Sequence, residues 1–95
     1  MDITIKLKVA EAVGLERAFL LEYVLNNKEE DGWTPIGIGE YRTHQELHIL
    51  SSQTMYYHIQ KLVTAGYLER RYSNRRESSR IRLTRLGKSL MGGVE

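Results

Sequence analysis

The segment SSQTMYYHIQKLVTAGY, residues 51–67, has the features of a single helix with a start, an end, a buried face and a polar face. Ser51 or Ser52 can cap its amino end by accepting a hydrogen bond from an otherwise unpartnered amide of the first turn. Gly66 stands where helices commonly end in a left-handed residue. We therefore predict a helix over residues 53–65. At about 100° per residue, one side of it collects the apolar side chains Met55, Ile59, Leu62 and Val63.

The opposite side of this helix carries hydrogen-bonding groups and no carboxylate. Amides, a phenol, an ammonium and hydroxyls can all bond to base edges or phosphates, and a DNA major groove accommodates one α-helix. The pattern therefore predicts a DNA-reading helix, although an ordinary solvated polar face is the alternative. The candidate DNA-binding residues on it are Ser52, Gln53, Thr54, Tyr56, Tyr57, Gln60 and Lys61.

The segments before this helix predict a strand and a first helix. In residues 2–9, the apolar side chains of Ile3, Ile5, Leu7 and Val9 alternate with polar ones, which is typical of a half-buried strand. Residues 11–27 have a helical pattern, with Gly14 as a kink or break before residues 15–27. The N-terminal segment is thus predicted as a short strand that leads into a helix.

The middle of the chain predicts a strand and a short helix. Residues 33–39, WTPIGIG, have two isoleucines in phase and a proline near the start, which is typical of a short edge strand. Thr43-His44-Gln45-Glu46 matches a capping box, in which a hydroxyl and a carboxylate bond to each other's backbone amides. We therefore expect a short helix to begin there and to carry Leu47 and Leu50.

The segments after Gly66 predict a hairpin and a last helix. Residues 67–72 (YLERRY) and 80–84 (RIRLT) are expected to form two antiparallel strands joined by the polar tip at residues 73–79. Leu68, Ile81 and Leu83 are expected to point inward. Thr84 can cap a helix over residues 85–91, which would end at Gly92-Gly93.

The order helix, short helix, turn, longer helix and hairpin resembles a winged helix-turn-helix. The run LSSQTMYYHIQKLVTAGYLERR resembles a bacterial and archaeal pattern in which Leu-Ser-x-x-Thr-apolar leads into Gly-aromatic-Leu and a basic strand. Its continuation, RRESSRIRLTRLGKSL, resembles the wing of MarR-like transcriptional regulators. VGLERAFLLEYVL followed by DGW is similar to the opening helix of DNA-binding domains in phage and plasmid replication proteins.

The first two resemblances cover residues 43–91 and imply an α+β fold with a three-helix core and a C-terminal β-hairpin wing, here with a short N-terminal strand. The sequence departs from the pattern at two places. His48-Ile49-Leu50 replaces the glycine that is common in the helix-turn-helix turn. The long helices with which MarR proteins dimerise and enclose ligands are missing, so the resemblance implies no effector pocket and no small-molecule partner is evident.

Charge is distributed unevenly along the chain. Residues 1–50 hold five Lys or Arg and nine Asp or Glu, a net charge of −4, whereas residues 51–95 hold nine and three, a net charge of +6. Seven arginines crowd residues 70–85, with Glu77 as the one acid among them. Crowded guanidiniums repel each other unless an anion lies between them, and their planar forks suit phosphate oxygens. The predicted hairpin contacts to DNA are Arg70, Arg71, Arg75, Arg76, Arg80 and Arg82, and a merely soluble charged hairpin is the alternative.

The first helix predicts a homodimer. Its apolar residues are spread nearly all round the helix, and a domain of 95 residues is expected to be too small to enclose them on every side. A second subunit is the simplest cover and would mirror a palindromic DNA site. The candidate interface residues are Leu15, Phe19, Leu20, Tyr23 and Val24.

Composition excludes several classes of protein. The chain has no cysteine, so zinc fingers, disulfide frameworks and thiol nucleophiles are ruled out. No apolar run approaches the ~18–20 residues that span a bilayer, and the N-terminus is not a signal peptide, so we expect a cytoplasmic protein. His44, His48 and His58 lack further ligands nearby, so we expect no metal site and no cofactor. No catalytic constellation is present, so we expect no enzyme.

These patterns predict a single domain over residues 1–95 that binds double-stranded DNA sequence-specifically and acts as a small transcriptional regulator. Three alternatives share the fold: a replication-initiation or partition accessory protein, a protein-interaction module and an RNA-binding winged helix. Fold alone does not distinguish them.

Overall fold

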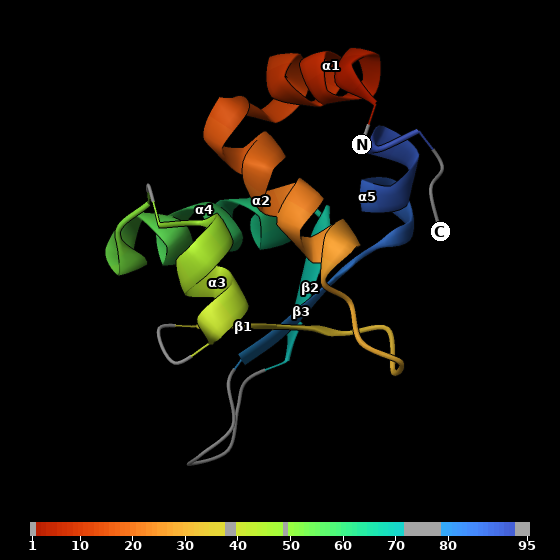
Figure 1. Ribbon diagram of the computed structural model, residues 1–95. Coiled ribbons are helices and arrows are strands. Elements are labelled where there is room, and N and C mark those ends of the chain that lie inside the picture. Colours follow the sequence, from red (N-terminus) through yellow and green to blue (C-terminus); the bar gives the residue numbers. More distant parts are fainter. Residues whose placement is uncertain (1, 38–39, 49, 72–78, 93–95) are drawn as a thin grey trace.

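The computed structural model describes residues 2–37, 40–48, 50–71 and 79–92 (Figure 1). In these residues the chain forms an α+β domain in which helices pack against a small antiparallel sheet. The elements are α1 (Ile3–Val13), α2 (Leu15–Asn26), β1 (Thr34–Ile36), α3 (Tyr41–Glu46), α4 (Ser52–Thr64), β2 (Leu68–Arg71), β3 (Ser79–Leu83) and α5 (Arg85–Leu90). Among the described helices, none combines the length and apolarity that a bilayer span requires.

Helix α4 has the start, the end and the buried face that its sequence predicts. The Ser51 hydroxyl accepts a hydrogen bond from the Thr54 amide at 3.2 Å, and Gly66 adopts a positive φ of 88° just beyond the helix. Three of the apolar side chains predicted on the inner face are buried, and the fourth is half-buried. In order along the helix these are Met55, Ile59, Leu62 and then Val63.

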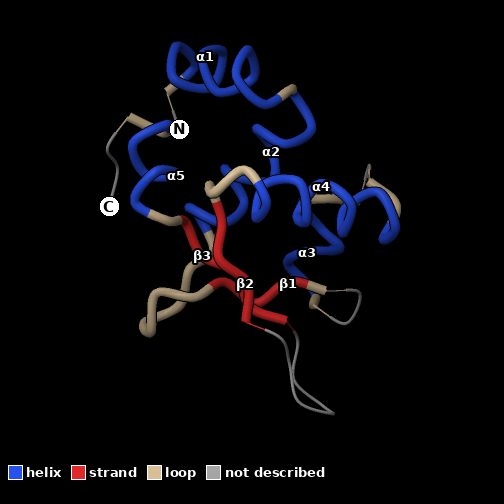
Figure 2. The backbone as a smooth tube through the Cα atoms, turned by 180° about the vertical axis from the view of Figure 1, so that it is seen from behind, coloured by secondary structure: helices blue, strands red, loops and turns tan. Residues whose placement is uncertain are grey.

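The sheet has the strand order β1-β3-β2, so the last strand in the chain lies in the middle. Both neighbours run antiparallel to β3, with Thr34 opposite Ile81 and Leu68 opposite Leu83. Figure 2 shows the sheet on one side of the helices. Because side chains alternate across a strand, Ile81 points into the core and its neighbour Arg82 points away from it. The sheet therefore has a core face and an outer face.

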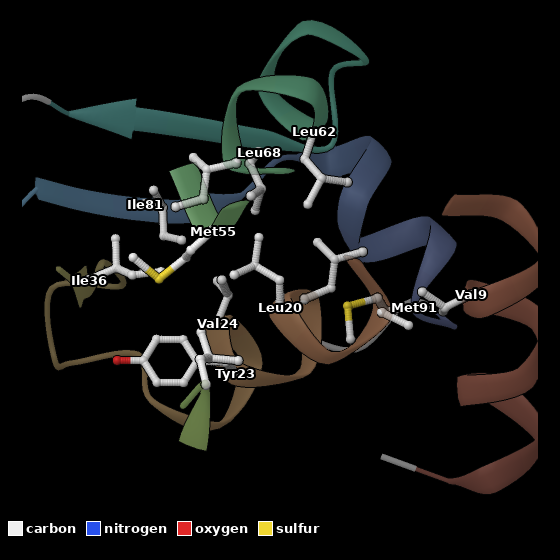
Figure 3. Packing of buried hydrophobic residues seen from close by; sticks show 14 residues of the cluster. Val9, Leu20, Tyr23, Val24, Ile36, Met55, Leu62, Leu68, Ile81 and Met91 are labelled. Carbon is white, nitrogen blue, oxygen red and sulfur yellow. The ribbon is translucent and has the colours of Figure 1, made fainter. Parts of the chain in front are cut away.

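One hydrophobic core joins the sheet to the helices. Helices α2 and α4 pack on each other and on the sheet, and the strand-predicted residues Leu68 and Ile81 contribute to this core as expected. Figure 3 shows the core side chains pointing toward one another from α2, α4, β1, β2 and β3. The buried hydrophobic residues are Val9, Ala18, Leu20, Leu21, Tyr23, Val24, Ile36, Leu47, Met55, Ile59, Leu62, Leu68, Ile81 and Met91.

The prediction of an N-terminal strand is wrong, because these residues form helix α1. Asp2 caps the helix by accepting a hydrogen bond from the Thr4 amide at 2.7 Å. Val9 is fully buried beside α2 and Met91 (Figure 3), whereas Ile3 and Leu7 are 68% and 62% exposed. A strand would have put all of these apolar residues on one side. Gly14 does break the helical segment, and it separates α1 from α2.

The prediction that Thr43 caps the third helix is also wrong. Helix α3 begins two residues earlier, at Tyr41, so Thr43 lies inside it and is buried. The Thr43 hydroxyl forms a 2.7 Å hydrogen bond with the Tyr23 hydroxyl, which in turn donates to the Pro35 carbonyl at 3.1 Å. The residue that looks like a cap therefore ties α3 to α2 and to β1. The helix ends at Glu46, before Leu47 and Leu50.

The argument that a single chain cannot cover α2 is wrong as well. Leu20 is fully buried within one chain, and Tyr23 and Val24 are each only 2% exposed, because α1, α4 and the sheet surround α2. These three residues are therefore not available to a second subunit. Of the five candidate interface residues, Phe19 is half-buried and Leu15 is 59% exposed.

Candidate nucleic-acid interface

The exposed face of α4 carries the polar residues that its sequence predicts. Its acid-free sequence SQTMYYHIQKLVT leaves Gln53, Tyr57, Gln60, Lys61 and Thr64 exposed, while Met55, Ile59 and Leu62 fix the opposite face in the core. The helix thus presents amide, phenol and ammonium groups together. Two further candidates, Thr54 and Tyr56, are half-buried, and the side chain of Ser52 lies outside the described residues.

Contacts within α4 restrict several of these side chains. The Lys61 ammonium lies 5.4 Å from the centre of the Tyr57 ring, and Gln60 Nε2 donates to Thr64 Oγ1 at 3.4 Å. The Thr54 hydroxyl accepts a hydrogen bond from Ser51 Oγ at 2.8 Å, so it belongs to the helix cap. Among the α4 candidates, those best placed to contact a partner are the exposed residues Gln53, Tyr57, Gln60 and Lys61.

A cluster of three side chains, which the sequence did not predict, joins α4 to the start of α2. Arg17 Nε donates to His58 Nδ1 at 3.0 Å, and His58 Nε2 lies 2.7 Å from Glu16 Oε2. Because Nδ1 accepts from Arg17, Nε2 carries the proton that is donated to Glu16. The His58 side chain is only 13% exposed and the bond to Arg17 is partly buried, whereas Glu16 is 56% exposed and its bond faces water. They help fix the orientation of α4 relative to α2.

The outer face of the sheet carries three of the predicted DNA-binding arginines, and all three contact acidic residues of the same chain. Arg80 Nη1 lies 2.8 Å from Glu29 Oε1, and Arg82 Nη2 lies 3.1 Å from Glu69 Oε2. Arg71 Nη2 lies 3.9 Å from Asp31. The acidic groups that pair with these guanidiniums thus belong to the same chain. A count of charges along the sequence could not reveal this pairing.

The single tryptophan completes this outer face. Trp33 lies between two arginines, with the guanidinium carbons of Arg82 and Arg71 at 4.3 Å and 4.9 Å from its ring centre. Trp33 follows the acidic turn of residues 28–32, and the Asp31 carboxylate accepts a hydrogen bond from the Trp33 amide at 3.0 Å. The turn and the tryptophan therefore contact arginines that the sequence predicted to bind DNA, although Arg71 and Arg82 stay exposed.

Arg70 differs from the other described arginines of the hairpin because it lies on the opposite side of the sheet, toward α4. Its guanidinium carbon is 5.2 Å from the centre of the Tyr56 ring, and Nη2 donates to Ser79 Oγ at 3.4 Å. Arg70 and Tyr56 thus link the hairpin to α4. Two other predicted contacts, Arg75 and Arg76, lie outside the described residues.

No group of His, Asp or Glu in the described part of the chain is arranged to hold a metal ion. The candidate residues on α4 and on the sheet carry hydrogen-bonding, aromatic and cationic groups, which can bind a partner.

No family model, curated protein or solved structure matches the chain.

Proposed function

We propose that the chain is a winged helix-turn-helix protein that binds double-stranded DNA with α4 in the major groove. The observation that carries the proposal is the exposed face of α4, where Gln53, Tyr57, Gln60 and Lys61 stand together on a helix without a carboxylate. Amides can bond to adenine edges in two places at once, and an ammonium can bond to guanine or to phosphate. A helix that approaches a polyanion gains from the absence of acids.

The arrangement of elements supports the same proposal. Helices α2, α3 and α4 precede the β2–β3 pair, and β1 adds a third strand to the sheet, as a winged helix requires. In this reading, α3 and α4 form the helix-turn-helix, and β2–β3 is the wing. The turn between α3 and α4 has no glycine, and it contains a hydrogen bond from the Leu50 amide to the Leu47 carbonyl at 3.0 Å.

We refine the expected role of the wing. Arg71, Arg80 and Arg82 have acidic partners in their own chain, so a phosphate would have to displace Glu29, Asp31 or Glu69. Exposed ion pairs contribute little free energy, about 0–1 kcal/mol, but they cancel the charge that attracts DNA. We therefore propose Lys61, which is exposed, as the main phosphate contact among the described residues. Arg70 packs against Tyr56 and bonds to Ser79, so its contact with DNA stays a prediction. The roles of Arg75 and Arg76 stay predictions.

The paired arginines give one alternative function specific support. A wing whose outer arginines are paired with acidic residues and contact Trp33 offers less charge to a polyanion, which favours a protein-interaction module with the same fold. The acid-free face of α4 outweighs this argument, because a protein partner does not require it. A transcriptional role remains our proposal over a replication or partition role, and a footprint at the chain's own promoter would distinguish it from an array of repeats at an origin.

The test is a binding titration with labelled random-sequence duplex DNA, duplex RNA and single-stranded DNA at several salt concentrations. We expect measurable affinity for duplex DNA that falls linearly with salt on logarithmic axes, because bound cations release counterions from DNA. Duplex RNA should bind more weakly, since its deep, narrow major groove does not admit side chains. Absence of DNA binding at low salt would favour the protein-interaction alternative.

A further inference from the structure

A second feature of the molecule is a cavity of about 310 Å³ away from the exposed face of α4. It lies where the end of α2, the turn at Gly32, the end of β3 and the start of α5 meet. Five charged residues line it: Lys28, Glu69, Arg82, Arg85 and Lys88. Four of these are cations and one is an anion, so the lining has a formal charge of +3.

The cavity lies beside the part of β3 that extends beyond its pairing with β1. The pairing of β1 with β3 ends at Thr34 and Ile81, so Arg82 and Leu83 continue without a β1 residue beside them. The end of α2 and α5 flank this open stretch of β3, and Leu25 and Leu83 supply an apolar part of the wall. The space therefore lies at one end of the sheet.

On the outer sheet face each described arginine has an acidic partner, but most cations of this cavity have none among the described residues. Arg82 lies 3.1 Å from Glu69, which satisfies that carboxylate. Lys28, Arg85 and Lys88 have no ion-pair partner among the described residues, and all three are exposed. Ammonium and guanidinium groups donate hydrogen bonds and accept none. The cavity thus offers three unpaired cationic donors to an acceptor with negative charge.

We propose that this cavity binds a small organic anion with more than one negative charge, such as a phosphomonoester or a di- or tricarboxylate. Its volume equals that of roughly ten liquid water molecules and lies at the lower end of the range of ligand pockets, about 300–1,000 Å³. The unpaired cations come from the turn after α2 and from α5 and line one space, whereas the phosphates of a duplex run along an extended line. This proposal does not depend on the function proposed for α4.

The experiment is isothermal titration calorimetry of the full chain with citrate and with glucose 6-phosphate at constant ionic strength. Glucose serves as the uncharged probe. We expect saturable binding of at least one anion and none of glucose, and the two anions distinguish a carboxylate from a phosphate ligand. Lys28→Gln and Lys88→Gln should each weaken binding roughly five- to tenfold, because each removes a charged hydrogen-bond donor.

The matched control is Lys8→Gln, which removes the same charge from an exposed position on α1. It should leave the affinity of the anion unchanged, and circular dichroism should show the same fold for all three variants. Saturable binding of neither anion would overturn the proposal. Equal weakening by Lys8→Gln would also overturn it, because it would reveal a general effect of net charge. Binding of glucose with the affinity of the anions would also overturn the proposal.

Discussion

Gly87 sets the distance between α5 and the chain segment that follows α4. It is buried, and a Cβ added to it would collide with the Tyr67 carbonyl oxygen and lie 3.1 Å from Leu83 Cδ2. The same carbonyl oxygen accepts a hydrogen bond from the Thr84 amide at 3.1 Å. Thr84 in turn caps α5 by accepting a hydrogen bond from the Gly87 amide at 3.0 Å, as its sequence predicts. The contact between backbone segments therefore depends on a residue without a side chain.

We expect Gly87→Ala to lower the free energy of unfolding by about 2 kcal/mol. The helix propensity of alanine would contribute up to about 1 kcal/mol in the other direction, but overpacking against backbone commonly costs about 1–3 kcal/mol or more. Urea denaturation measures the difference. The control is Ser89→Ala at an exposed position of α5, which should change stability by less than about 0.5 kcal/mol. Equal stability of the two variants would contradict this account of Gly87.

His58 of α4 forms hydrogen bonds with two side chains of α2. We expect His58→Ala to destabilise the fold by about 1–2 kcal/mol, because a partly buried hydrogen bond to Arg17 and an exposed one to Glu16 are lost. His48→Ala is the control, since that imidazole is exposed and contacts only the nearby Gln45 carbonyl. Chemical denaturation of both variants gives the comparison. A loss in His48→Ala as large as that in His58→Ala would show that the cluster contributes no specific stability.

At the scale of elements, the structure brings together charges that the sequence keeps apart. The acidic turn of residues 28–32 belongs to the half of the chain with a net charge of −4, and β3 belongs to the half with +6. Glu29 and Asp31 nevertheless lie on the outer sheet face beside Arg80 and Arg71. Part of the basic surface expected from the sequence is therefore neutralised in the folded chain.

This pairing predicts different salt responses for two cations that differ in their surroundings. We expect Lys61→Gln to reduce the slope of log affinity for DNA against log salt by about one, because we propose that its exposed ammonium binds a phosphate. Arg82→Gln should change the slope much less, because that guanidinium is held by Glu69 and stacks on Trp33. Fluorescence anisotropy at several salt concentrations measures both slopes. If Arg82→Gln reduces the slope as much as Lys61→Gln does, the outer sheet face is part of the DNA interface.

The sequence predicted those elements whose signals are local. Helix α4, the two strands β2 and β3, and α5 follow from caps, a terminal glycine and apolar periodicity that act within a few residues. Helix α1 was missed because alternation over residues 3–9 also fits a helix in which Ile5, Val9 and Val13 share a face. Thr43 was wrongly predicted as a cap because its hydrogen-bond partner, Tyr23, is twenty residues away and has no local signature.

The candidate site was predictable only in part, for a similar reason. Periodicity separates the exposed Gln53, Tyr57 and Gln60 from the buried face of α4, since both belong to one helix. The pairing of Arg82 with Glu69 depends on strand register, and that of Arg80 with Glu29 depends on the path of a turn. Side chains that meet across elements need the tertiary structure.

For the whole molecule, burial of α2 changes where a dimer can form. Leu20, Tyr23 and Val24 belong to the core of one chain. The predicted homodimer would therefore have to form through other surfaces. Large apolar side chains that are still exposed include Leu7 on α1 and Leu15 at the start of α2, at 62% and 59%. A dimer that buries them would gain roughly 25 cal/mol for each Å² of apolar area removed from water.

We therefore expect Leu7→Glu to convert a dimer into a single chain of 11.0 kDa without loss of fold. The reason is that a carboxylate at this exposed position costs little in the monomer but is unpaired in an apolar interface. Sedimentation equilibrium of both proteins, with Lys8→Gln as a control on the same helix, measures the mass. A wild-type species at the mass of one chain would refute the dimer, and a Leu7→Glu dimer would place the interface elsewhere.

The central claim is that α4 reads base edges in duplex DNA, and a selection from a random duplex pool tests it most directly. Purified wild-type protein should enrich a defined motif, whereas Gln53→Ala, Tyr57→Ala and Gln60→Ala should each relax the preference at particular base pairs by about 1–3 kcal/mol. All three positions are exposed, so circular dichroism should be unchanged, and Ser89→Ala should enrich the wild-type motif. Selection of no motif by the wild-type protein, or of the same motif to the same degree by all three α4 variants, would contradict the claim.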